Sequence, residues 1–233
     1  MNTQDKIGDV VVFQPSSGYR FSIDSLLLAD FAKPRNKDKI LDLGCGCGII
    51  SLLLAKKLSE INIIGIEIQE SLAELAKQNV TSNHLNSKIE IILGDIKNIK
   101  QLIPAGNFDY IISNPPFRPA QAGRICPNLS EAIARHEIKV NLDDILKGAR
   151  YGLRSGGKLA VIYPAELTAK LIKALCEKKL EPKRIQFVHP SKEQKARMVM
   201  IEACKDGGVE VKILNPIFLD SHYLQGGRQT FLK

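Results

Sequence analysis

The chain has 233 residues, of which 44% are hydrophobic, and carries a formal net charge of +8. This length suits one large α/β domain with a well-buried core, and the composition excludes a disordered or low-complexity protein. The longest apolar runs are too short to cross a bilayer, and the first nine residues include three charged side chains instead of a signal peptide. We therefore expect a cytoplasmic protein without membrane contact.

The predicted elements begin with a short apolar helix over residues 25–31, which Ser22 or Asp24 can cap. From residue 39 onward, predicted strands alternate with predicted helices. The strands cover residues 40–43, 62–68, 88–93, 108–113, 158–163, 184–189 and 197–204, and the helices cover residues 49–59, 69–83, 142–153 and 165–179. This order predicts a Rossmann-like α/β fold with a mostly parallel seven-stranded sheet. The last two strands are joined by a short link, so one strand near the C-terminus is expected to be antiparallel.

These elements are expected to form a single domain over residues 1–233. Residues 1–38 form an N-terminal extension with the capping helix, residues 39–206 the Rossmann-like core, and residues 207–233 a C-terminal extension. A monomer is favoured.

The cysteines and histidines show no pattern typical of a metal site. The cysteines are odd in number, at five, and no Cys-x-x-Cys pair is completed by a second pair or by histidines, which is typical of free, reduced thiols. His136-Glu137 could begin a metalloprotease motif, but the second histidine would fall at position 140, which is Val140. No metal is expected.

A glycine-rich loop follows the first strand of the core, in Asp42-Leu43-Gly44-Cys45-Gly46-Cys47-Gly48. Glycines let the backbone turn sharply and approach a ligand, and the next helix presents its N-terminus there. A dinucleotide fingerprint would need a glycine at position 49, which is Ile49. Because Asp42 would repel a diphosphate, we expect a cationic or ammonium-bearing ligand.

Two more acidic residues stand at the ends of the next two strands. Glu67 can accept both hydroxyl protons of a ribose, Ile68 can lie against an adenine ring, and Asp95 can accept a hydrogen bond from an adenine amino group. Each acid alone is more often a helix cap or a solvated turn. Three acids at successive strand ends, behind a Gly-x-Gly-x-Gly loop, favour a nucleoside site.

The fourth strand ends at Asn114-Pro115-Pro116-Phe117. The prolines cannot continue a ladder of hydrogen bonds, so a stiff loop is expected at the carboxyl end of a buried strand, where open α/β sheets bind ligands. The loop offers an amide, carbonyls and an aromatic face, which suit a flat ligand with an NH2 group. Read alone, the same residues are equally typical of a tight turn.

With both motifs, the chain resembles the class I S-adenosylmethionine-dependent methyltransferases of the Asn-Pro-Pro-Phe/Tyr group over nearly its full length. Within that group it resembles most closely the bacterial family that methylates N6 of the adenosine immediately 3′ of the anticodon in a valine tRNA. The segments that carry this narrower resemblance are Gly18 to Ser25, Gly65-Ile66-Glu67-Ile68-Gln69, Asn114 to Phe117, Ala196-Arg197-Met198 and Glu202-Ala203-Cys204-Lys205.

The resemblance implies that S-adenosyl-L-methionine is the cofactor and assigns a role to each motif. Ser22 and Asp24 approach the methionine end, while Glu67, Ile68 and Asp95 hold the adenosine. The methionine portion is held by Asp42, Gly44, Gly46 and Gly48, with Asn114 bordering the cofactor.

Asn114, Pro115 and Phe117 are the implied catalytic residues. An adenine amino nitrogen shares its lone pair with the ring, so it attacks a sulfonium methyl only once its protons are held out of the ring plane. The Asn114 side-chain oxygen and the Pro115 carbonyl could each accept one proton, while Phe117 stacks on the base. No strong base is then required.

The charge distribution favours tRNA as the partner. Between Lys170 and Arg197 there are nine cationic and three acidic residues, and the expected basic surface includes Arg118, Lys195 and Arg197. The link over residues 118–137 adds Arg124 and Arg135. A helix face kept soluble by lysine is the alternative for the basic stretch, and exposed arginines without a role are the alternative for the link.

Two other substrates fit the same loop: guanine N2 of ribosomal RNA, and a protein glutamine. The chain has no duplicated half, as guanine enzymes often have, although short versions exist. About 39 residues precede the first strand of the core, too few for a helical protein-recognition domain. DNA adenine methylation would need an added recognition domain.

Overall fold

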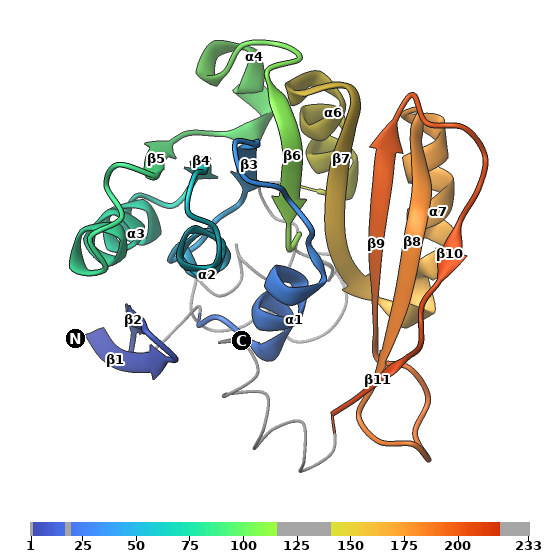
Figure 1. Cartoon of the computed structure of the whole chain (residues 1–233), viewed down its shortest axis with the longest axis horizontal. Helices are drawn as coiled ribbons and strands as arrows, with labels where there is room; N and C mark the ends of the chain where they lie inside the picture. Colours follow the sequence, from blue (N-terminus) through green and yellow to red (C-terminus); the bar gives the residue numbers. More distant parts are fainter. Residues whose placement is uncertain (1, 17–19, 116–140, 220–233) are drawn as a thin grey trace.

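The computed structural model describes residues 2–16, 20–115 and 141–219, which form three layers (Figure 1). A mostly parallel sheet lies in the middle, with seven long strands in the spatial order β5-β4-β3-β6-β7-β9-β8. They are β3 (Lys39–Leu43), β4 (Asn62–Glu67), β5 (Ile89–Leu93), β6 (Phe108–Ser113), β7 (Leu153–Pro164), β8 (Leu180–His189) and β9 (Met198–Lys205). Strand β9 is antiparallel to both of its neighbours. The predicted Rossmann-like sheet with one antiparallel strand is confirmed.

Helices cover both faces of the sheet because successive strand residues point to opposite sides. Ile40 belongs to one buried cluster and Leu41 to the other. The first face carries α1 (Ile23–Phe31), α2 (Ile49–Lys57) and α3 (Glu70–Ser82). The second face carries η1 (Ile96–Asn98), α4 (Ile99–Leu102), α6 (Leu142–Gly152) and α7 (Thr168–Glu177), which follows η2 (Ala165–Leu167).

The register of the parallel strands brings their carboxyl ends to one edge of the sheet. Asp42 pairs with Gly65 on one side and with Ile112 on the other, and Glu67 pairs with Leu93. The segments that follow β3, β4, β5 and β6 therefore emerge side by side.

Several elements were not predicted. A hairpin of β1 (Asn2–Ile7) and β2 (Val10–Pro15) precedes α1, so the N-terminal extension holds more than the expected capping helix. Strands β10 (Lys212–Ile213) and β11 (Ile217–Phe218), from the predicted C-terminal extension, pair in parallel with β8 and enlarge the sheet. Strand β7 begins five residues before its predicted start, because Gly156 and Gly157 bend the strand there without ending it.

The hairpin is attached to α3 by two buried asparagines. Asn79 accepts a bond from the backbone N–H of Phe13 (2.7 Å) and donates to its carbonyl (2.9 Å), and Asn83 does the same for Val11 (2.9 and 2.6 Å). Four residues of helix rise about 6 Å and two residues of strand about 6.8 Å, so the two spacings match. The asparagines thus take the place of a neighbouring strand for β2.

A polar cluster lies within the apolar layer beneath α1. The Glu202 carboxylate, 1% exposed, accepts hydrogen bonds from the Tyr110 hydroxyl (2.5 Å) and from Arg184 (3.1 Å), and pairs with Lys158 (3.4 Å). Arg184 also lies 4.6 Å from the centre of the Phe31 ring and donates to the Phe31 carbonyl. The buried charge is therefore paired, and the cluster joins β6, β7, β8 and β9 to the end of α1.

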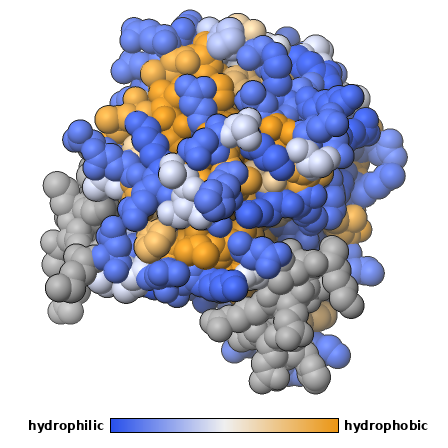
Figure 2. All heavy atoms as spheres, turned by 60° about the vertical axis from the view of Figure 1, so that its left-hand side comes forward, coloured by the Kyte–Doolittle hydropathy of each residue, from blue (hydrophilic) through white to orange (hydrophobic). Residues whose placement is uncertain are grey.

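The surface toward the hairpin, α3 and β5 is mixed, with apolar areas between hydrophilic side chains (Figure 2). Strand β5 ends the sheet on this side, and Leu93 is 45% exposed there. Among the described residues, no helix is long and apolar enough to span a membrane. The cytoplasmic location stays a prediction.

Replacing Asn83 with alanine should lower the free energy of unfolding by about 1–3 kcal/mol, because the Val11 N–H and carbonyl would lose their partner. Asn86→Ala is the matched control, since Asn86 is exposed and accepts a bond from the Thr81 hydroxyl at the surface. That variant should stay within about 0.5 kcal/mol of the parent in urea unfolding. Equal losses from both variants would contradict the role given to Asn83.

Candidate active site

Asp42 is a buried carboxylate at the base of the glycine loop. Its Oδ2 atom accepts a hydrogen bond from the Ser51 hydroxyl (2.7 Å), in the first turn of α2. Its Oδ1 atom has no hydrogen-bond partner among the described residues. Burial raises the pKa of Asp42 to about 7, and the bond from Ser51 opposes this rise. One acceptor is therefore left unused beside the loop.

The glycine loop is held by the end of β4. The N–H groups of Gly44 and Cys45 both donate to the Ile66 carbonyl, at 2.9 and 3.1 Å. Gly44, Gly46 and Gly48 all have positive φ, at 74°, 57° and 84°, which side chains rarely tolerate. Gly44 is exposed, and a Cβ built there would meet nothing within 4 Å. The space above Gly44 is thus open to a ligand.

Glu67 joins three segments at the edge of the sheet. Its carboxylate, 5% exposed as a residue, accepts hydrogen bonds from the N–H groups of Gly46 (2.9 Å) and Gln69 (2.9 Å). The Glu67 carbonyl accepts a bond from the Gly94 N–H (2.8 Å). Burial raises the pKa of Glu67, while these backbone bonds to the carboxylate lower it. The Ile68 N–H also lowers this pKa, so three backbone donors act on a carboxylate with about four lone pairs, and it can still accept a ligand hydroxyl.

Asp95 caps η1 at the end of β5. Its Oδ1 atom accepts a hydrogen bond from the Lys97 N–H (2.9 Å), and the residue is half-buried. Ile68, between Glu67 and α3, is half-buried against the second apolar cluster. Both residues follow the carboxyl ends of parallel strands, and their role toward a ligand stays a prediction.

The end of β6 lies next to the end of β3. The buried Ser113 hydroxyl donates to the Leu43 carbonyl (2.8 Å), which holds Asn114 beside the glycine loop. Asn114 is half-buried, and its Nδ2 atom donates to the Ser25 hydroxyl (3.3 Å) in the first turn of α1. Ser22 is the N-cap of the same helix, where its hydroxyl accepts from the Asp24 N–H (3.3 Å). The start of α1 therefore reaches Asn114.

The expected site residues thus meet at one edge of the sheet, as far as the described residues go. Pro116, Phe117 and the arginines at 118, 124 and 135 lie outside these residues. Pro115 follows Asn114 and is buried.

The basic stretch is not one continuous surface. Arg184 is half-buried and bonded to Glu202, Lys178 pairs with Asp143 (2.8 Å), and Lys173 pairs with Glu177 (3.9 Å). Lys195 and Arg197 are exposed in the loop between β8 and β9, which lies at the carboxyl end of β8. The sequence could not separate these groups, because Arg184 and Glu202 are distant in the chain and meet across paired strands.

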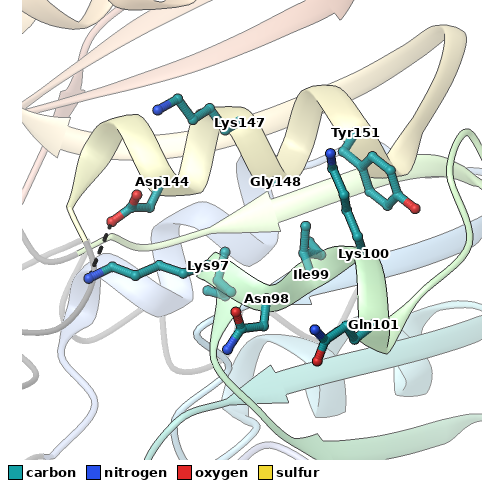
Figure 3. Close-up of a pocket in the computed structure, with 10 residues that line it drawn as sticks. Lys97, Asn98, Ile99, Lys100, Gln101, Asp144, Lys147, Gly148 and Tyr151 are labelled. Carbon is teal, nitrogen blue, oxygen red and sulfur yellow. Dashed lines mark ion pairs between the residues drawn. The ribbon is translucent and has the colours of Figure 1, made fainter.

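A separate pocket of about 390 Å³ lies between η1, α4 and α6 (Figure 3). Lys97 and Asp144 form an ion pair of 4.0 Å at one end, and Tyr151 lies near the other. Asp42, Glu67 and Asn114 do not line this pocket, so it is distinct from the candidate site that they form. Within the ranges that the structure describes, no group of three or more His, Cys, Asp or Glu side chains is placed to hold a metal.

Three serines of the site were missed at the sequence level: Ser25, Ser51 and Ser113. Each is at most 2% exposed and bonds a site residue or the end of a neighbouring strand. The available signal was a lone hydroxyl within an apolar run, as in Ile49-Ile50-Ser51-Leu52. That signal does not say which partner the hydroxyl meets.

The strand order with its single long antiparallel strand, the glycine loop after β3 and the acid at the end of β4 define a class I methyltransferase. Residues 17–182 match the family model "Methyltransferase small domain". The chain belongs to this family, and S-adenosyl-L-methionine is its cofactor.

Curated relatives and solved structures agree with this assignment. A tRNA1(Val) (adenine(37)-N6)-methyltransferase of Bacteroides fragilis is 25% identical over 95% of this chain and 94% of its own. One of Bacteroides thetaiotaomicron is 29% identical over 71% of this chain and 68% of its own. A predicted O-methyltransferase from Agrobacterium tumefaciens superposes with a TM-score of 0.69 at 20% identity, covering 88% of this chain and 95% of that one. This last likeness shows the fold alone.

The free energy of unfolding of Asp42→Asn, relative to that of the parent, should rise as the pH is raised from 5 to 8. A pKa raised from 3.8 to about 7 means that the folded protein binds more protons than the unfolded chain in this window, so the parent loses stability as the pH rises. The change is at most about 1.4 kcal/mol per pH unit. Urea unfolding of both proteins at several pH values measures it.

Asp206→Asn is the control, because Arg150 and Ser155 lower the pKa of Asp206. A pKa below 3.8 places the titration of Asp206 below this range, so its difference from the parent should stay constant from pH 5 to 8. A constant difference between Asp42→Asn and the parent across this range would refute the assignment of a raised pKa to Asp42.

Proposed function

We propose that this methyltransferase transfers the methyl group of S-adenosyl-L-methionine to N6 of an adenosine in tRNA, in the anticodon loop of valine tRNA. The observation that carries the proposal is the placement of Asn114, whose half-buried amide stands beside the glycine loop at the carboxyl end of β6. The curated relatives named for this activity, at 25% and 29% identity, support it.

The residues at the edge fit the cofactor. The unused Oδ1 atom of Asp42 can accept a hydrogen bond from an ammonium group, directly or through water, and the open space above Gly44 leaves room for the methionine portion. The remaining acceptor capacity of the Glu67 carboxylate suits a ribose hydroxyl, and Asp95 and Ile68 suit the adenine. Ser22 and Asp24, at the start of α1, close the methionine end. The bound cofactor supplies an electrophilic methyl on a sulfonium.

Asn114 and Pro115 prepare the substrate nitrogen. Their oxygens each accept a hydrogen bond from one N–H of the amino group, so its lone pair turns away from the ring and toward the methyl. The new N–C bond forms as the C–S bond breaks, and the extra proton then leaves the nitrogen for solvent. Asn114 therefore acts as a hydrogen-bond acceptor, and the reaction needs no strong base.

An anticodon loop suits this site because its bases are already unpaired, so little energy is needed to move one of them to Asn114. The exposed cations of the loop between β8 and β9, Lys195 and Arg197, stand at the same edge of the sheet and can contact phosphates. They are the part of the predicted basic surface that the proposal keeps.

Methyl transfer from labelled S-adenosyl-L-methionine to a mixture of unmodified tRNA, ribosomal RNA and cell protein tests the substrate. The products are digested and identified by mass. N6-methyladenosine in the tRNA fraction is the expected result, and tRNA species purified by hybridisation then identify the acceptor. Label in N2-methylguanosine or in glutamine would overturn the proposed substrate and leave the family assignment intact.

Asn114→Ala should lower the rate of methyl transfer on the order of 100-fold or more, since it removes an acceptor that acts in the transition state. Cofactor affinity, measured by calorimetry, should stay close to that of the parent. Asn107→Ala is the matched control, because Asn107 precedes β6 at its opposite end and accepts a bond from Lys39. Equal loss of rate and cofactor affinity in Asn114→Ala would refute the acceptor role.

A further inference from the structure

Ser25 is a buried hydroxyl that no part of the proposed mechanism uses. It is 2% exposed, it is the third residue of α1, and its Oγ atom accepts a hydrogen bond from Asn114 Nδ2 at 3.3 Å. The two residues are 89 positions apart in the sequence. The contact therefore depends on where the fold places α1.

Helix α1 is attached to β6 at both of its ends. At the far end, the Lys33 N–H donates to the hydroxyl of Tyr110 on β6 (3.1 Å), and Tyr110 is held by Glu202. Helix α1 rises about 9 Å from Ser25 to its last residue, Phe31, and Lys33 follows after the extended Ala32. From Tyr110 to Asn114 the strand extends about 13 Å. The two contacts thus match along the helix and the strand, which run in opposite directions.

The orientation of the Asn114 amide decides whether it can accept a hydrogen bond from the amino group of the substrate. Only the carbonyl oxygen accepts, while the NH2 group would face the amino group of the substrate donor to donor. Of the two orientations that a hydroxyl partner allows, the structure has the one in which Ser25 Oγ accepts from the NH2 group of Asn114. With Nδ2 turned toward Ser25, as observed, Oδ1 is the end left for the substrate.

We infer that Ser25 is a positioning residue for Asn114: its hydroxyl takes the Asn114 NH2 group and so directs the Asn114 carbonyl oxygen to the substrate nitrogen. Ser25 touches neither substrate nor cofactor in this role. The inference rests on the proposed transfer to an amino group, whichever nucleotide carries that group.

Replacing Ser25 with alanine should lower the single-turnover rate roughly tenfold at saturating RNA and cofactor, the effect of losing one hydrogen bond. The Kd of S-adenosyl-L-methionine and the melting temperature should stay close to those of the parent. Ser25→Thr, which keeps a hydroxyl, should recover most of the rate. The inference would be overturned if the Ser25→Ala variant were as fast as the parent. It would also be overturned if a Ser25→Thr variant of normal stability were as slow as Ser25→Ala.

The same substitution in an Asn114→Asp background separates positioning from simple packing. A carboxylate presents an acceptor in either orientation, so Ser25→Ala should change the rate of Asn114→Asp far less than tenfold. The same loss in both backgrounds would show that Ser25 only supports the packing of α1. If Asn114→Asp is too slow to measure, the comparison of Ser25→Ala with Ser25→Thr tests the role of Ser25. If Ser25→Thr has a low melting temperature, the Asn114→Asp background tests it instead.

Failure of this inference is distinguishable from failure of the proposed function. If the proposed function is wrong, the parent enzyme itself does not place label in N6-methyladenosine of tRNA. If only the role of Ser25 is wrong, the parent does so, and Ser25→Ala either does so equally fast or loses the same factor in the Asn114→Asp background.

Discussion

The buried Glu67 carboxylate is the contact on which the arrangement of the site depends. It accepts hydrogen bonds from the N–H groups of Gly46 and Gln69, and so holds the glycine loop against the end of β4 and the start of α3. These bonds act together with those from the N–H groups of Gly44 and Cys45 to the Ile66 carbonyl, and they fix a loop with three positive φ angles. The same carboxylate keeps lone pairs for a ribose, so one group both builds the site and is available to its ligand.

Polar side chains join segments that are distant in the sequence, and two of these contacts reach the glycine loop and Asn114. Asn79 connects the N-terminal hairpin to α3 and also donates to the Cys47 carbonyl in the glycine loop (2.9 Å). Ser25 and Tyr110 connect α1 to β6. The segment before the core is therefore part of the site, although it contributes no strand to the main sheet.

The sequence predicted the core well because its signals are local. Buried parallel strands are continuous apolar runs, and glycines and acids at their ends are visible one residue at a time. The segment Phe108 to Ser113 was predicted at its observed bounds for this reason. The hairpin was missed because β1 is polar and because the asparagines that attach β2 to α3 are about 70 positions away in the sequence. The roles of Ser25 and Ser51 likewise depend on partners that only the folded chain identifies.

The basic stretch shows the same limit of sequence analysis, because the partners of its charges are found only in the folded chain. A count of charges over residues 170–197 suggested one surface, but Arg184 is used within the protein and only part of the stretch faces the ligand edge. Net charge describes the long-range field of a protein, and it does not say which cations are free to meet a partner.

A crystal structure of the protein with S-adenosylhomocysteine tests the account most directly. The account predicts the ribose hydroxyls on the Glu67 carboxylate and the amino acid portion over Gly44 beside Asp42. It also predicts that the Asn114 side-chain oxygen points to the space next to the sulfur, where the substrate nitrogen would lie. A ligand bound instead in the pocket between α4 and α6, or bound at the edge without contact to Glu67, would contradict it.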